Sequence, residues 1–90
     1  MPRITNKQIL DVVKKLRINI EAITLNTLKQ GIKVEFEHGK IHPKTNITND
    51  NLEMTIKIVL AHLYESLDYY KELEIMESKL KKPKVKLFLD

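Results

Sequence analysis

Apolar residues recur at helical spacing in four parts of the chain, and the first of these begins close to the N-terminus. Thr5 and Gln8 have the spacing of a capping box, in which each side chain binds the backbone of the other residue at the start of a helix. The apolar positions that follow are spaced i, i+3, i+4 and i+7, and they are Ile9, Val12, Val13 and Leu16. This pattern predicts an amphipathic helix over residues 5–17.

A second apolar stripe begins after Thr24, which is a residue type suited to capping a helix N-terminus. The stripe consists of Leu25, Leu28, Ile32 and Phe36. We expect Gly39 to end this helix, because glycine accepts the left-handed conformation that commonly follows a helix. Gly31 lies inside the helix at a cost of about 1 kcal/mol relative to alanine. We therefore expect another element to approach the backbone closely at Gly31.

Residues 40–48 predict a loop, because Pro43 interrupts the helical pattern and KTNITND is rich in turn-forming side chains. Thr48, Asn49 or Asp50 is then expected to cap a third helix that runs to about Glu65. One side of this helix carries Leu52, Ile56, Val59, Leu60 and Leu63, and the nearly opposite side carries Met54, Ile58 and Ala61. A helix that is apolar on two sides is expected to lie in the middle of the fold.

After a break at residues 66–68, a fourth stripe has the spacing i, i+4, i+7 and i+11, formed by Tyr69, Leu73, Met76 and Leu80. Pro83 is expected to end this helix. The final KVKLFLD alternates like a strand but has no partner strand, which indicates a flexible or docking tail. We predict an all-α protein: a compact bundle of three to four helices in one domain, residues 1–80, with a basic tail, residues 81–90. The predicted core comprises Leu28, Ile32, Phe36, Leu52, Ile56, Val59, Leu60, Leu63, Tyr69 and Leu73.

Composition narrows the class of protein. With 90 residues the chain has room for one modest core, and without cysteine it can form neither a disulfide nor a thiolate zinc site. A reducing, cytoplasmic location is therefore expected, and no apolar run is long enough for a membrane span. The net charge of +4 is divided into +5 over residues 1–33, −5 over 34–78 and +4 over 79–90. Residues 1–78 are therefore neutral overall and only the tail is basic, which is not the charge distribution of a uniformly basic nucleic-acid-binding protein.

Four segments carry a family resemblance: LRINI, LKQGIKVEFEHG, TNITNDNLEMTIKIVLAHL and DYYKELEIMES, within residues 16–77. Together they resemble a small uncharacterised domain found in bacteria, phages and large DNA viruses. The matching positions are Gly31, Glu35, Glu37, His38, Gly39, Thr45, Asn46, Thr48, Asp50, Ala61, His62, Leu63, Tyr69 and Tyr70. Leu67 departs from the family, in which proline is common there. The resemblance implies a compact helical domain, in a host cytoplasm or a virion if the protein is viral, and it supplies no activity.

A metal site is one chemical hypothesis. Glu35 and His38 lie three residues apart, as do His62 and Glu65, and residues at this spacing share a helix face. Glu35, His38 and His62 could together bind a divalent ion such as iron, manganese or zinc. In an antiparallel hairpin of the second and third helices, however, His38 and His62 would lie about 18 Å apart at 1.5 Å per residue. Only a diagonal loop or a symmetric dimer would bring them together.

A structural role for these residues is the simpler interpretation. Glu35 borders the apolar stripe, so burial would require a polar partner. The residues that could hold a ligand or fix the loop beside Glu35 and His38 are Glu37, His42, Asn46, Thr48 and Asp50. Loop fixing is the favoured interpretation because buried polar groups are normally satisfied within the protein. His62 is likewise expected to be a hydrogen-bonded core histidine beside Thr55, Tyr69 or Tyr70.

The sequence favours a non-catalytic binding module that engages a protein partner, with KVKLFLD as a candidate docking segment. No nucleophile triad and no glycine-rich phosphate loop is present to indicate an enzyme. Nucleic-acid binding is a further alternative, and it rests on Lys79, Lys81, Lys82, Lys84 and Lys86. A solvated tail explains these lysines more simply, because no helix-turn-helix accompanies them. A homodimer is also compatible with the sequence.

Overall fold

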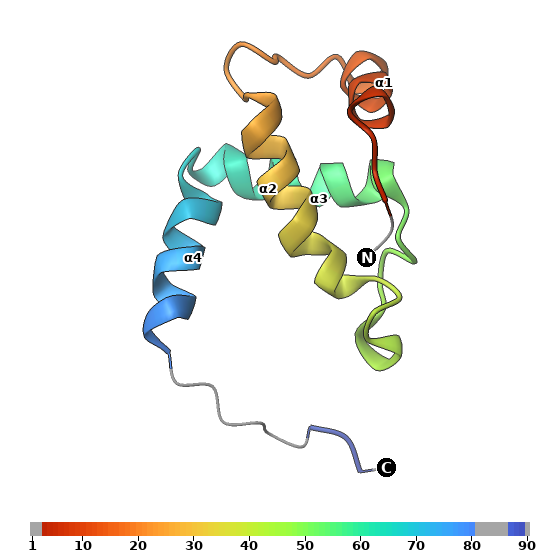
Figure 1. The fold of residues 1–90 in the computed structure, drawn as a ribbon, viewed down its shortest axis with the longest axis vertical. Coiled ribbons are helices and arrows are strands. Elements are labelled where there is room, and N and C mark those ends of the chain that lie inside the picture. The colour runs from red at the N-terminus through yellow and green to blue at the C-terminus, as the bar shows by residue number, and fades with distance from the viewer. Residues whose placement is uncertain (1–2, 81–86, 90) are drawn as a thin grey trace.

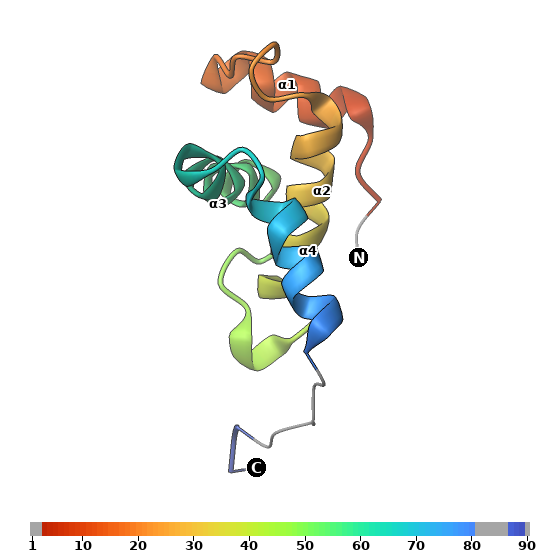
Figure 2. The same cartoon turned by 90° about the vertical axis from the view of Figure 1, so that its left-hand side faces the viewer.

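A computed structural model describes residues 3–80 and 87–89 of the chain. Its helices are α1 (Asn6–Leu16), α2 (Leu25–Glu35), α3 (Leu52–Glu65) and α4 (Tyr69–Lys79), with 3-10 turns η1 (Phe36–His38) and η2 (Pro43–Thr45). Figure 1 shows α2 crossing α3, with α1 and α4 towards the two ends of α3. Viewed after a 90° turn, α3 is seen nearly end-on while α2 runs along the vertical axis (Figure 2). The predicted all-α bundle is confirmed.

Most helix boundaries follow the predicted local signals. The capping box of α1 is present, since the Gln8 N–H donates to Thr5 Oγ1 at 3.2 Å and the Thr5 N–H donates to Gln8 Oε1 at 2.8 Å. Thr24 caps α2 by accepting the Thr27 N–H at 3.3 Å. The third helix ends at Glu65 as predicted, and the fourth begins directly after the expected break.

The predicted cap of α3 is wrong. The cap is Asn51, whose side chain accepts the Met54 N–H at 2.9 Å. Asn49 and Asp50 instead have left-handed backbone conformations, with φ of 52° and 61°. These turn the chain so that the Asp50 carboxylate reaches back and accepts the Lys40 N–H at 3.0 Å. Asp50 is therefore committed to the loop and is not available to cap the helix.

Gly39 also has a different role from the predicted one. Its φ is −103°, so it does not end α2 in a left-handed conformation. A Cβ atom at this position would instead overlap the carboxylate of Asp50. Glycine is needed here for close approach, and η1 separates it from the end of α2.

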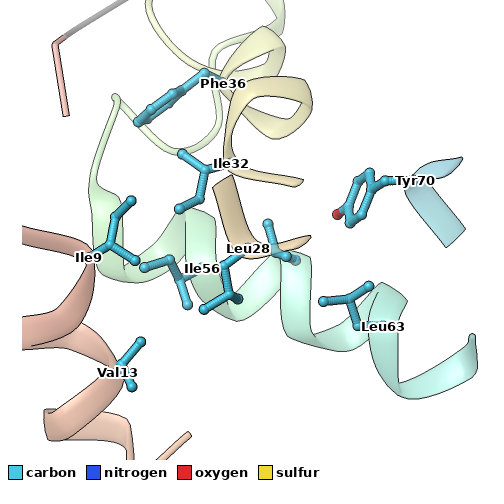
Figure 3. Packing of buried hydrophobic residues seen from close by; sticks show 9 residues of the cluster. Ile9, Val13, Leu28, Ile32, Phe36, Ile56, Leu63 and Tyr70 are labelled. Atoms are coloured by element: carbon cyan, nitrogen blue, oxygen red, sulfur yellow. The ribbon is translucent and has the colours of Figure 1, made fainter. Parts of the chain in front are cut away.

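The core lies where α3 meets the other three helices. Its buried apolar residues are Ile9, Val13, Leu28, Ile32, Phe36, Ile56, Val59, Leu63 and Tyr70 (Figure 3). The predicted core residues Leu52, Leu60, Tyr69 and Leu73 are only partly buried. Tyr70 takes the central position that was predicted for Tyr69. The central place of the third helix is confirmed, although its second apolar side leaves Met54 exposed.

Beyond Leu80, the chain is described only at residues 87–89. The Lys44 Nζ lies 5.0 Å from the centroid of the Phe88 ring, so this part of the tail contacts η2. Pro83 and most of the predicted strand-like tail lie outside the described residues. Over residues 3–80 and 87–89, no helix is both long and apolar enough to cross a membrane.

Candidate functional site

Glu35, the last residue of α2, is a charged side chain in the interior of the domain and is only 4 % exposed. Its carboxylate accepts a hydrogen bond from the Tyr70 hydroxyl, with an O–O distance of 2.7 Å. A hydrogen bond to an ionised acceptor is shorter and stronger than one between neutral groups. This bond therefore compensates part of the cost of burying the carboxylate.

Two histidines face the same carboxylate from different elements. His38 Nε2, from η1, lies 3.7 Å from Glu35 Oε1. His62 Nε2, from α3, lies 3.6 Å from Glu35 Oε2. Each imidazole becomes an ion-pair partner of Glu35 when it is protonated. We call Glu35, His38, His62, Tyr69 and Tyr70 the Glu35 centre.

The tyrosines of the Glu35 centre hold His62 in place. The His62 ring stacks on Tyr69, with the ring centroids 4.2 Å apart and the planes inclined by 4°. Tyr70 meets Tyr69 edge to face at 4.9 Å. Offset-stacked and edge-to-face pairs are the favourable aromatic arrangements. Side chains of α3 and α4 are thus packed together at the point where both reach Glu35.

The environment of Tyr70 keeps its hydroxyl protonated. Burial raises the pKa of Tyr70 well above its ordinary value, and the hydrogen bond to the Glu35 carboxylate raises it further. A phenolate here would be desolvated and would face a second negative charge. Tyr70 therefore remains a hydrogen-bond donor to Glu35 throughout the neutral range.

Gly31 makes room for Tyr70. A Cβ atom at Gly31 would lie 2.6 Å from Val59 Cγ1 and 2.8 Å from Tyr70 Cε2, which is closer than side chains can pack. The missing side chain lets the Tyr70 ring pass between α2 and α3 and reach Glu35. The predicted close approach at Gly31 is confirmed.

The structure brings together the three residues of the metal hypothesis. Because α2 and α3 cross and do not form an antiparallel hairpin, the expected separation of His38 from His62 is wrong (Figure 1). The two imidazoles nevertheless approach different oxygens of Glu35, and one of these oxygens is already engaged by Tyr70. Within the described part of the chain, no three His, Asp or Glu side chains are placed so that they could hold a metal ion.

The other candidate residues lie in the loop between α2 and α3. The backbone carbonyl of His38 accepts the N–H groups of Ile47 at 2.7 Å and Thr48 at 3.3 Å. Asn46 accepts the Asn49 N–H at 2.8 Å through its side chain. The loop is thus fixed by Asn46, by Asp50 and by the backbone of His38, whereas the side chain of His38 faces Glu35. The remaining candidates, Glu37 and His42, are exposed.

Sequence reasoning did not identify Tyr70 as the partner of Glu35. The helical stripe pointed to Tyr69, which lies one residue and about 100° away on the helix. The available signal was Gly31, since a glycine inside a helix often accommodates a bulky side chain from another element. Of the nucleic-acid candidates, Lys79 is exposed at the end of α4, and Lys81, Lys82, Lys84 and Lys86 lie outside the described residues.

Fold and site together define a small all-α domain built around a buried carboxylate that accepts a hydrogen bond from tyrosine. The chain belongs to the family described as protein of unknown function DUF5661, whose model matches residues 9–79. The matched region includes every residue of the Glu35 centre and extends from α1 to the last residue of α4. No curated protein and no solved structure matches the chain.

Proposed function

We propose that this protein is a non-catalytic interaction module that binds a partner protein on one side of α4. The observation that carries the proposal is the exposure of the α4 stripe: Met76 is 52 % exposed and Leu80 is 54 % exposed. Tyr69 and Leu73, from the same stripe, are only partly buried. We call these four residues the α4 flank. An apolar stripe that remains in water is a common mark of a protein-binding surface.

The geometry of α4 explains why this stripe is not used in the core. The helix packs on α2 and α3 through Tyr70, which is held by Glu35 and Gly31. At about 100° per residue, Met76 and Leu80 lie about 80–120° around the helix from Tyr70. When α4 is oriented so that Tyr70 donates its hydrogen bond to Glu35, the α4 flank therefore faces solvent.

The flank is also hollowed. A shallow depression of about 470 Å³ is lined by Ser66, Tyr69, Glu72, Leu73 and Met76. Tyr69 is held by its stacking on His62, so this wall is already ordered before a partner binds. Rigid aromatic anchors lower the entropy cost of association and often carry much of the binding energy. The Glu35 centre supports this function by fixing the surface rather than by performing chemistry.

The resemblance adds an expectation about biological setting. A domain of this kind in bacteria, phages and large DNA viruses would act in the cytoplasm of a bacterial or host cell. A small accessory protein that holds another protein fits this setting.

Site-specific photocrosslinking tests the proposal in cells that carry the gene. A benzophenone amino acid replaces Met76 in one protein and Lys71, exposed on another side of α4, in a control. A discrete crosslinked protein is expected from position 76 and not from position 71. An excess of unlabelled wild-type protein should abolish the adduct.

A matched pair of variants provides the competition control. Met76→Asp removes an apolar side chain from the flank, and Met54→Asp removes one of similar exposure, 46 %, from α3. For a partner other than a second copy of this chain, the Met54→Asp protein should compete as well as wild type, while the Met76→Asp protein should not, and equal competition by both variants contradicts the proposed docking surface. Equal labelling from positions 76 and 71 contradicts it for any partner.

A further inference from the structure

A second hollow with apolar lining residues lies along α2, where Ile4 and Ile9 meet this helix. It is a groove of about 400 Å³ lined by Ile4, Ile9, Lys29, Gln30, Ile32, Lys33 and Phe36. Ile9, Ile32 and Phe36 belong to the buried core and lie close together beneath the groove (Figure 3). We call this the α1/α2 groove.

The groove has a distinct charge. Its only ionisable lining residues, within the described chain, are Lys29 and Lys33. They are four residues apart on α2, so their ammonium groups lie on the same side of the helix. The segment to which they belong, residues 1–33, carries a charge of +5. A groove whose two ionisable lining residues are both cations suits an apolar helix that carries acidic residues, and of the two lysines Lys33 also lines a neighbouring hollow with Glu37, Glu74 and Glu77.

The α4 flank has the complementary character. Its apolar residues are accompanied by Glu72, which lines the same depression, and the chain just before it contributes Glu65 and Asp68. We propose that the α1/α2 groove receives the α4 flank of a second copy of this chain. The inference rests on the proposed function, which it deepens by naming the partner.

Such an interface joins two different surfaces, so its geometry is head to tail. α1, α2 and α4 are fixed in one core, so the flank cannot move into the groove of its own chain, although Gln30 and Lys33 of the groove line a hollow together with Leu73 of the flank. A pair of copies joined in this way still has one free groove, on one copy, and one free flank, on the other. Head-to-tail contacts of this kind close into a ring or continue as an open chain.

Two variants, each with one surface disabled, test the inference in the full-length protein. The groove variant carries Lys29→Glu and Lys33→Glu, and the flank variant carries Met76→Asp. All three positions are exposed, so the fold should be retained, and circular dichroism verifies this. In sedimentation velocity, the wild-type mass should rise with concentration above that of the monomer, whereas each variant alone should remain monomeric.

Mixing the variants gives the decisive result. The groove variant retains its flank and the flank variant retains its groove, so an equimolar mixture should double in mass and grow no further. A charge-matched control, Lys14→Glu with Lys71→Glu, should associate like wild type, because neither lysine lines the groove. Association should weaken at high salt because it depends on opposite charges.

Three outcomes overturn the inference. The first is a wild-type protein that stays monomeric at every concentration. The second is a groove variant that still dimerises alone, which indicates a symmetric contact between two α4 flanks. The third is a mixture with no dimer. If the wild type is monomeric but a different protein crosslinks at position 76, self-association fails while the proposed function stands.

Discussion

Removing the Tyr70 hydroxyl is the most direct test of the Glu35 centre. Tyr70→Phe deletes the donor 2.7 Å from Glu35 Oε2 but keeps the buried ring that packs against Gly31. A hydrogen bond to a charged group contributes about 1.5–3 kcal/mol, and a buried acceptor left without its donor is costly. The imidazoles at 3.6 and 3.7 Å can compensate in part by moving closer. We therefore expect the free energy of unfolding to fall by about 2 kcal/mol.

Urea unfolding followed by circular dichroism measures this change. For a domain of this size, about 2 kcal/mol corresponds to a decrease in Tm of about 10 °C. Tyr64→Phe is the matched control, because Tyr64 is 94 % exposed and loses only a hydroxyl in water. Its unfolding free energy should stay within about 0.5 kcal/mol of wild type.

A double-mutant cycle with Glu35→Gln separates the charge from the packing. Glutamine still accepts a hydrogen bond from Tyr70, but a neutral pair is worth only about 1 kcal/mol. Tyr70→Phe should therefore cost less in the Glu35→Gln background than in wild type. Equal costs in both backgrounds, or a wild-type loss no larger than that of Tyr64→Phe, would refute a charge-assisted bond in the Glu35 centre.

Three further predictions concern stability. Gly31→Ala should destabilise the protein by about 1–2 kcal/mol in urea unfolding, because overpacking against Val59 outweighs the gain in helix propensity. Adding Val59→Ala should recover part of this loss. If the destabilisations of the two single variants simply add in the double variant, the proposed clash is contradicted. Thr48→Val should raise the unfolding free energy by about 1 kcal/mol, because Thr48 Oγ1 is buried with no hydrogen-bond partner among the described residues. A destabilised variant would show that the hydroxyl makes a hydrogen bond in the folded protein. Because the pKa of Tyr70 is raised in the folded protein, the stability that its protonated hydroxyl contributes is complete below the ordinary pKa of 10.0 and is lost above it, by at most about 1.4 kcal/mol per pH unit. In urea unfolding between pH 9 and 11, the unfolding free energy should therefore decline less in Tyr70→Phe than in wild type. Equal declines in the two proteins would exclude this linkage.

Local signals in the sequence were sufficient for most of the secondary structure. Thr5 and Thr24 cap helices because the groups that they bind lie only three residues away. The cap of α3 was not predictable in this way, because Asp50 has a competing contact with the backbone of Lys40, ten residues earlier. Choosing Asn51 over Asp50 requires the path of the loop, which neighbouring residues alone do not determine.

Only part of the candidate site was predictable, because some of its contacts are made between residues far apart in the sequence. The position of Glu35 at the edge of an apolar stripe indicated that its carboxylate would need a polar partner if it were buried, and it is buried. Its partner Tyr70 is 35 residues away and reaches it only because α2 and α3 cross beside Gly31. Periodicity places residues on the face of a single helix but does not give the angle at which two helices pack. The helical stripe therefore selected Tyr69 for the core.

The Glu35 centre and the α4 flank are connected by the rotation of α4 about its own axis. Apolar packing is non-directional, so an amphipathic helix would gain most by turning its stripe of Tyr69, Leu73, Met76 and Leu80 into the core. The bond from Tyr70 to Glu35 is directional, and Gly31 leaves room for the Tyr70 ring beside Val59. A buried polar contact often adds little net stability compared with apolar packing, but it can select one arrangement among several. In this domain, the arrangement selected by the buried carboxylate is the one that keeps Met76 and Leu80 in solvent, where a partner can reach them.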